Sequence, residues 1–272
     1  MEKKQTMSIL NRKEPVVFLS GRGLLVEMLM ALLVLLLYGP APLLATTRIG
    51  DEAESRRIWN FDSETAGTLP QNFVVGTLVD GRPAGDWQVI DMKKSLSLLH
   101  DLDRREHLRL KKVLQTLEAP SPSQVMAQLK NRGFEQDYNV VLVERTTTAE
   151  LDLRVSLLPV AGKGDMGGGL IWRAQDHQNY YITRANPLEQ NIRFYRVVKG
   201  VRYKLANFDH IISVETWHTF RVVARDNHFQ IIFDGQTVFD IRDETFQSGQ
   251  IGLWTKADAV TYFDDLRLSV VK

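Results

Sequence analysis

Apolar and polar residues alternate through most of the chain after residue 124. Segments 151–157, 192–197 and 229–233 follow this period of two, which is typical of half-buried β-strands. Turn-forming residues separate the apolar runs, and Asp234-Gly235 between two of them predicts a β-hairpin. About a dozen short strands with almost no helix between them predict an all-β, antiparallel jelly-roll β-sandwich.

Residues 93–118 have a different period. Their leucines recur mostly at steps of three and four, with charged residues between them, which predicts an amphipathic helical insertion with a break near Arg105. A proline-rich stretch at 119–123 ends it. The apolar stripe of the insert requires a covering surface. We expect it to pack on its own domain, and a protein partner bound through the insert is the alternative.

The N-terminal 45 residues have the pattern of an export signal. Residues 1–23 are polar and basic, residues 24–37 are apolar except for Glu27, and small residues lead to Ala45. This order predicts a signal peptide at 1–45, cleaved after Ala45, and a periplasmic or secreted domain at 46–272. The alternative is a hydrophobic helix at 24–44 that stays in the membrane as an anchor. The membrane is then contacted only through this segment.

The remaining composition narrows the function classes. The formal net charge is +1, so no basic field indicates a nucleic-acid partner. The chain has no cysteine, which excludes disulfides and thiolate metal sites. The histidines show no metal-ligand spacing, and no motif identifies a metal site or a catalytic residue.

Three stretches resemble a known family. They are residues 167–173 with Tyr180-Tyr181, residues 217–222 leading to 233–235, and residues 249–254 leading to 262–266. Their order resembles the concanavalin A-like lectin/glucanase superfamily, nearest to laminin G-like domains and the 3-keto-disaccharide hydrolase domain. The resemblance covers about residues 59–270 and implies a jelly roll. Within it, we expect Trp217 and Trp254 to bridge the two sheets.

The resemblance implies a sugar-related function. The glucanases of this superfamily carry alternating Glu, Asp and Glu on one strand, and no such run occurs here. The catalytic residues therefore stay unknown. A carbohydrate-binding, lectin-like protein is the first hypothesis. A glycoside hydrolase of the 3-keto-disaccharide type and a non-catalytic protein-interaction module are the alternatives.

The loop at residues 184–191, between two aromatic-rich strands, is the best candidate for a binding site. It combines guanidinium, amide and carboxylate groups with nearby aromatic rings, the mixture that binds sugar hydroxyls and ring faces. The predicted ligand-binding residues are Trp172, Arg173, Tyr181, Arg184, Asn186, Glu189, Gln190 and Asn191.

Two further carboxylate groupings suggest chemistry. Glu189 with Asp176 is a candidate glycosidase acid/base pair, which requires carboxyl groups roughly 5 to 10 Å apart. Asp258, Asp264 and Asp265 are candidate calcium ligands. Calcium takes six to eight oxygens, so three carboxylates do not establish a site, and no other cofactor is expected.

Overall fold

The computed structural model describes residues 56–78, 82, 85–99, 102–121, 124–130 and 137–270. The predicted signal peptide at 1–45 and the alternative anchor at 24–44 lie outside these residues. Within the described ranges, no helix has the length and apolar character needed to cross a bilayer.

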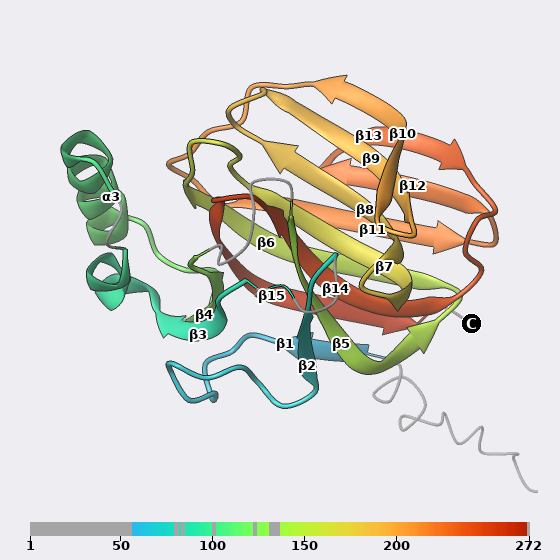
Figure 1. Cartoon of the computed structure of the whole chain (residues 1–272), viewed down its shortest axis with the longest axis horizontal. Helices are drawn as coiled ribbons and strands as arrows, with labels where there is room; N and C mark the ends of the chain where they lie inside the picture. Colours follow the sequence, from blue (N-terminus) through green and yellow to red (C-terminus); the bar gives the residue numbers. More distant parts are fainter. Residues whose placement is uncertain are drawn as a thin grey trace, which may run out of the picture. The chain divides into compact units, whose positions relative to one another are not determined.

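Two antiparallel sheets form the sandwich (Figure 1). Sheet A has the strand order β13-β12-β11-β6-β15-β4-β3, and β1 also pairs with β15. Its strands are β1 (Arg56–Trp59), β3 (Trp87–Asp91), β4 (Gln124–Gln128), β6 (Leu151–Ala161), β11 (His218–Arg225), β12 (His228–Phe233), β13 (Gln236–Arg242) and β15 (Val260–Val270).

Sheet B has the strand order β10-β9-β8-β7-β14-β5-β2. Its strands are β2 (Phe73–Gly76), β5 (Tyr138–Thr148), β7 (Gly168–Asp176), β8 (Asn179–Asn186), β9 (Asn191–Val198), β10 (Val201–Asp209) and β14 (Gly249–Lys256). All strand pairs are antiparallel, and the predicted all-β sandwich is confirmed.

The core between the sheets is rich in aromatic rings. Trp172 stacks on Phe194 and Tyr181 at ring-centroid distances of 5.2 and 5.6 Å and meets Phe229 edge-on. Inward-facing Val, Leu and Ile residues of both sheets complete this core, as the period of two requires.

The expectation that Trp217 and Trp254 bridge the sheets is wrong. Trp254 belongs to the apolar cluster on the outer face of sheet B, and Trp217 packs against the cluster on the outer face of sheet A. Trp172 and Trp87 are the tryptophans buried between the sheets. Tryptophan is large enough for either place, so its presence near a strand end does not determine its side of the sheet.

Two turn features follow directly from glycine positions. Asp234 and Gly235 both have positive φ, 46° and 81°, as a two-residue hairpin turn of the type I′ class requires. At Gly169, an added Cβ would lie 1.8 Å from the Thr183 carbonyl oxygen of β8. The glycine run at 167–169 therefore permits the close approach of β7 to β8.

The predicted helical insertion is confirmed. It consists of a 3-10 helix, Met92–Leu98, and α3, Arg104–Thr116. The first ends at Leu98 and the second begins at Arg104, next to Arg105. Asp103 and Glu106 form a capping box that fixes the start of α3.

The apolar stripe of the insert covers one half of the outer face of sheet A. Leu110 and Leu114 of α3 pack with Val125, Leu158 and Tyr262 of the sheet. The insert thus packs on its own domain, as expected. Binding of a protein partner through its remaining surface stays a prediction.

Candidate functional site

The outer face of sheet B carries a second aromatic layer. Tyr138, Tyr180, Tyr195 and Trp254 project from it, and all four are buried. They alternate along their strands with core residues: Tyr180 is followed by the core residue Tyr181, and Tyr195 follows the core residue Phe194. Successive residues of a strand point to opposite faces. Two consecutive aromatic residues therefore place one ring in the core and one on the outer face of sheet B.

Arg202 of β10 lies over this aromatic layer. Its guanidinium carbon is 4.9 Å from the ring centroids of Tyr138 and Tyr195 and 5.9 Å from that of Trp254. These separations are within the range of cation–π interactions. Because β5 and β10 stand near opposite ends of the strand order, the rings and the arginine together fill the space above the strands between them.

Two polar atoms of this layer are buried close to each other and have no other hydrogen-bond partner in the described structure. They are the hydroxyl of Tyr180 and the indole Nε1 of Trp254. Burial raises the pKa of Tyr180, so this hydroxyl keeps its proton and remains a donor. Because the Trp254 indole interacts with the Tyr180 oxygen, the Tyr180 O–H remains a buried donor without an acceptor, which is costly.

A charged rim follows at the end of β8 and the start of β9. The Glu189 carboxylate accepts from Arg184 at 2.8 Å and pairs with Arg193 at 2.7 Å. Arg184 is buried and also donates to the Asn191 side chain at 2.6 Å. Partial burial raises the pKa of Glu189, but the two arginines outweigh it and hold that pKa below its ordinary value. Glu189 is therefore an ionised acceptor.

A second carboxylate, Asp165, lies behind this rim. It accepts from the Asn186 side chain at 2.9 Å and lies 3.6 Å from the Lys256 ammonium group. Burial raises the pKa of Asp165 despite the nearby charges of Arg184 and Lys256, and the charge of Glu189 adds to the increase. The two carboxylates are thus within electrostatic range and are shifted in opposite directions.

The structure brings part of the predicted ligand-binding set together. Arg184, Asn186, Glu189 and Asn191 form the charged rim and its support. The Gln190 side chain is used differently: it donates to the Pro187 carbonyl and accepts from the Ile212 amide, so it anchors neighbouring backbone.

Three predicted residues lie elsewhere. Trp172 and Tyr181 are enclosed between the two sheets in the core, so a ligand on an outer face does not reach their rings. Arg173 is buried and donates to the carbonyl oxygens of Ala149, Asp226 and Phe246, so it holds three loops at one edge of the sandwich. The physical reason is that successive residues of a strand point to opposite faces of the sheet. Tyr180 therefore faces the site, and Tyr181 faces the core.

The residues that the sequence reasoning missed are Tyr138, Tyr195, Trp254 and Arg202. Strand alternation identifies the outward set once one outward residue is known, but Tyr180-Tyr181 is aromatic at both parities. The approach of Arg202 to Tyr138 joins positions 64 residues apart in sequence across the sheet, and no local pattern signals it.

The proposed pairing of Glu189 with Asp176 is contradicted by the topology. Asp176 pairs with Asn179 at the start of β8, and Glu189 follows the end of β8 at Asn186. At about 3.3 Å per residue, the strand separates them by roughly 20 Å, which exceeds the 5 to 10 Å that a glycosidase pair requires.

The three candidate calcium ligands have separate partners. Asp258 accepts from the backbone amides of residues 163–165, Asp264 accepts from Ser121, and Asp265 pairs with Arg267. No group of three or more His, Cys, Asp or Glu residues that could hold a metal ion occurs in the part of the chain that the structure describes. Calcium binding stays a prediction without a ligand set in these residues.

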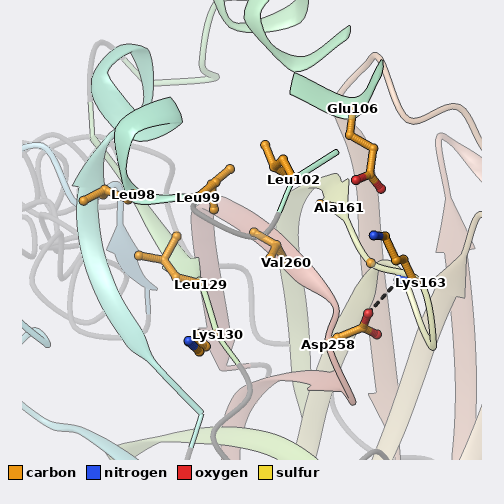
Figure 2. A pocket seen from close by; sticks show the side chains of 11 residues that line it. Leu98, Leu99, Leu102, Glu106, Leu129, Lys130, Ala161, Lys163, Asp258 and Val260 are labelled. Atoms are coloured by element: carbon orange, nitrogen blue, oxygen red, sulfur yellow. Dashed lines mark hydrogen bonds between the residues drawn. The ribbon is translucent and has the colours of Figure 1, made fainter. Parts of the chain in front are cut away.

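A recess of about 260 Å³ lies between the helical insert and the sandwich. Figure 2 shows Leu99, Leu102 and Val260 around it, with Glu106 and Lys163 on one side. Asp258 beside them is already bonded to the Lys163 amide. The recess is largely apolar and lacks the aromatic and amide groups of the sheet B face, so it is the weaker saccharide candidate.

Comparison with known proteins supports the sequence-based resemblance. Residues 148–269 match the model of the 3-keto-alpha-glucoside-1,2-lyase-like domain, which confirms the predicted resemblance to the 3-keto-disaccharide hydrolase domain over these residues. The chain is also 27% identical to Levanase from Bacillus subtilis over 108 residues, which are 39% of this chain and 16% of levanase. The match thus spans a small part of that enzyme.

Solved structures with similarity to the chain include a carbohydrate-binding module, CBM66, from Bacillus subtilis. It is 20% identical with a TM-score of 0.48, and the match covers 56% of this chain and 90% of the module. A β-glucanase from Bacillus licheniformis is 11% identical with a TM-score of 0.44, covering 80% of this chain and 99% of the glucanase. At these identities the likeness concerns the fold.

Proposed function

We propose that this protein binds a saccharide at the outer face of sheet B. The observation that carries the proposal is the combination on one sheet face of aromatic rings, Arg202 and the rim of Glu189 and Arg193. Sugars are bound by such combinations, because ring C–H groups pack on aromatic faces while hydroxyls bond to planar polar groups.

The comparisons support the same class of ligand. The family model covers residues 148–269, which include the rim, Arg202, Tyr195 and Trp254. The printed names of the relatives refer to a levanase and a carbohydrate-binding module. A ligand would approach at the rim, since Glu189 and Arg193 are partly exposed while the rings beneath Arg202 are buried.

Thermal melting against a panel of neutral oligosaccharides, fructans included, tests this proposal. A ligand at about 100 times its dissociation constant adds roughly 2.7 kcal/mol of stability, a rise of about 5 to 10 °C for a domain of this size. Glu189→Gln should weaken binding about tenfold or more through loss of a charge-assisted acceptor. Asp176→Asn, at the end of β7 and beside the start of β8, is the matched control and should leave affinity unchanged. No shift with any saccharide would contradict the proposal.

The second candidate is cleavage of a 3-keto-glycoside, as the matching family's description suggests. A 1,2-elimination moves the C2 proton to a base, forms a C1=C2 bond and releases the glycosidic oxygen, which takes a proton from an acid. Asp165, whose pKa burial raises, is the candidate acid. The ion pairs of Glu189 lower its basicity and favour binding over catalysis.

Turnover separates the two candidates. A 3-keto-disaccharide incubated with the protein would yield a free aglycone if the chain is a lyase or hydrolase, and Asp165→Asn would abolish the release. Saturable binding with no product over many hours would support the carbohydrate-binding function. The matching variant Asp176→Asn again serves as the control.

We further propose that the protein is exported by residues 1–45, with the domain released to the periplasm or medium. The order of basic, apolar and small residues supports this assignment. The mass of the protein recovered outside the cytoplasm tests it. Cleavage after Ala45 predicts a chain starting at Thr46, whereas an intact N-terminus in the membrane fraction would indicate an anchor at 24–44.

A further inference from the structure

The open half of the outer face of sheet A carries a row of arginines. Arg221, Arg154 and Arg267 are direct neighbours across three adjacent strands: Arg221 pairs with Arg154 between β11 and β6, and Arg154 pairs with Arg267 between β6 and β15. Arg56 of β1, paired with Ser269, adds a fourth guanidinium to the same recess of about 240 Å³.

Repulsion between these neighbouring arginines destabilises the folded state. Like charges directly opposite each other on neighbouring strands are destabilising, and here the central Arg154 faces one on each side. Asp152 accepts two hydrogen bonds from Arg221, and Asp265 pairs with Arg267. Four guanidinium groups against these two carboxylates leave two positive charges.

Arg154 and Arg56 carry this excess. Both are exposed, and neither has an ion pair with any residue for which the structure gives a placement. Arg154 lies in the middle of the row, with paired arginines on both sides that are held in place by their carboxylates. The recess thus holds two guanidinium groups that carboxylates fix in place, Arg221 and Arg267, and two that no carboxylate neutralises, Arg154 and Arg56.

From this geometry we infer an oxyanion site at Arg56, Arg154, Arg221 and Arg267 for the phosphate or sulfate group of a soluble ligand. Guanidinium groups match such anions with two parallel hydrogen bonds, and a doubly charged anion would neutralise the excess of two. The recess of about 240 Å³ is large enough to admit such a group. This site is on the opposite sheet from the proposed saccharide face and is independent of it.

The test uses the full chain and inorganic phosphate, with sodium chloride at equal ionic strength as the reference. Thermal melting and calorimetric titration should show saturable phosphate binding to the wild type. Arg154→Gln should reduce the affinity at least tenfold. The same variant should melt no lower than the wild type in phosphate-free buffer, because it relieves the repulsion in the row. A merely structural arginine would give a lower melting temperature instead.

Arg104→Gln is the matched control, since Arg104 is an exposed arginine at the start of α3 and the charge change is the same. It should keep phosphate binding. Equal phosphate effects on wild type and Arg154→Gln, or an effect reproduced by chloride, would overturn the inference. So would binding to anionic lipid vesicles that Arg154→Gln weakens without any response to phosphate, which would indicate a membrane surface as the partner.

Discussion

The two sheets share one core, but their outer faces differ in what covers them. On sheet A, a separate chain segment supplies the cover: Leu110 and Leu114 of the insert pack on one half, and the other half stays open and arginine-rich. On sheet B, the face carries its own aromatic rings, and among the described residues the side chains of Arg202 and Leu78 pack against them. A cover of individual side chains such as Arg202 can be displaced by a ligand at far lower cost than a packed helix.

The largest effect is expected where the insert covers sheet A. Leu110→Ala removes a fully buried side chain from the interface between α3 and the sheet, and such substitutions cost about 2 to 5 kcal/mol. Leu108→Ala, on the exposed side of the same helix, should cost under about 0.5 kcal/mol. Chemical denaturation of both variants measures the difference. Equal small losses would show that the insert does not stabilise the sandwich.

A pH-dependent effect is expected at the connection from the insert to sheet A. The Asp264 carboxyl is buried against Ser121, and burial raises its pKa to about 6. Between about pH 4 and 6 the unfolded chain loses this proton while the folded chain keeps it, so the contribution of Asp264 to stability falls as pH rises through this window. The fall is on the order of 1 to 3 kcal/mol.

Asp264→Asn removes this titration. The difference in unfolding free energy between wild type and the variant should therefore shift in favour of the variant as pH rises from 4 to 6, then stay constant above it. Measuring the difference cancels the titration of the other groups. Asp265→Asn, next in sequence and paired with Arg267, is the control. A pH-independent difference for Asp264→Asn would mean that its carboxyl titrates normally.

The smallest effect is expected at the cover of sheet B. Arg202→Met keeps an apolar chain over Tyr138 and Tyr195 but removes the cation, at a cost of about 1 kcal/mol. Lys204→Met, an exposed position on the same strand, should be neutral within about 0.5 kcal/mol. A loss for Arg202→Met as large as that for Leu110→Ala would remove the distinction between the two covers.

The same contrast explains what could be predicted from sequence. Local structure is determined by neighbouring residues, as in the strand alternation, the Asp234-Gly235 turn and the leucine period of 93–118. The sandwich and its insert can therefore be predicted from these patterns. The site depends on which face of the sheet each strand residue points to, and on contacts between strands that are distant in sequence. The sequence pattern predicts Tyr181 and Trp172 as ligand contacts, but they face the core. Arg184 and Glu189 were found because their loop gathers polar groups within six residues.

The placement of a saccharide on sheet B is tested most directly by the indole N–H resonances of the five tryptophans during an oligosaccharide titration. Each resonance is assigned by a Trp→Phe variant. Trp254 lies in the aromatic layer on the outer face of sheet B, whereas Trp87 lies in the core and Trp217 beside the insert. We expect the Trp254 resonance to shift saturably while those of Trp87 and Trp217 stay in place. A saturable shift at Trp217 with Trp254 unchanged would place the ligand at the insert and contradict the account.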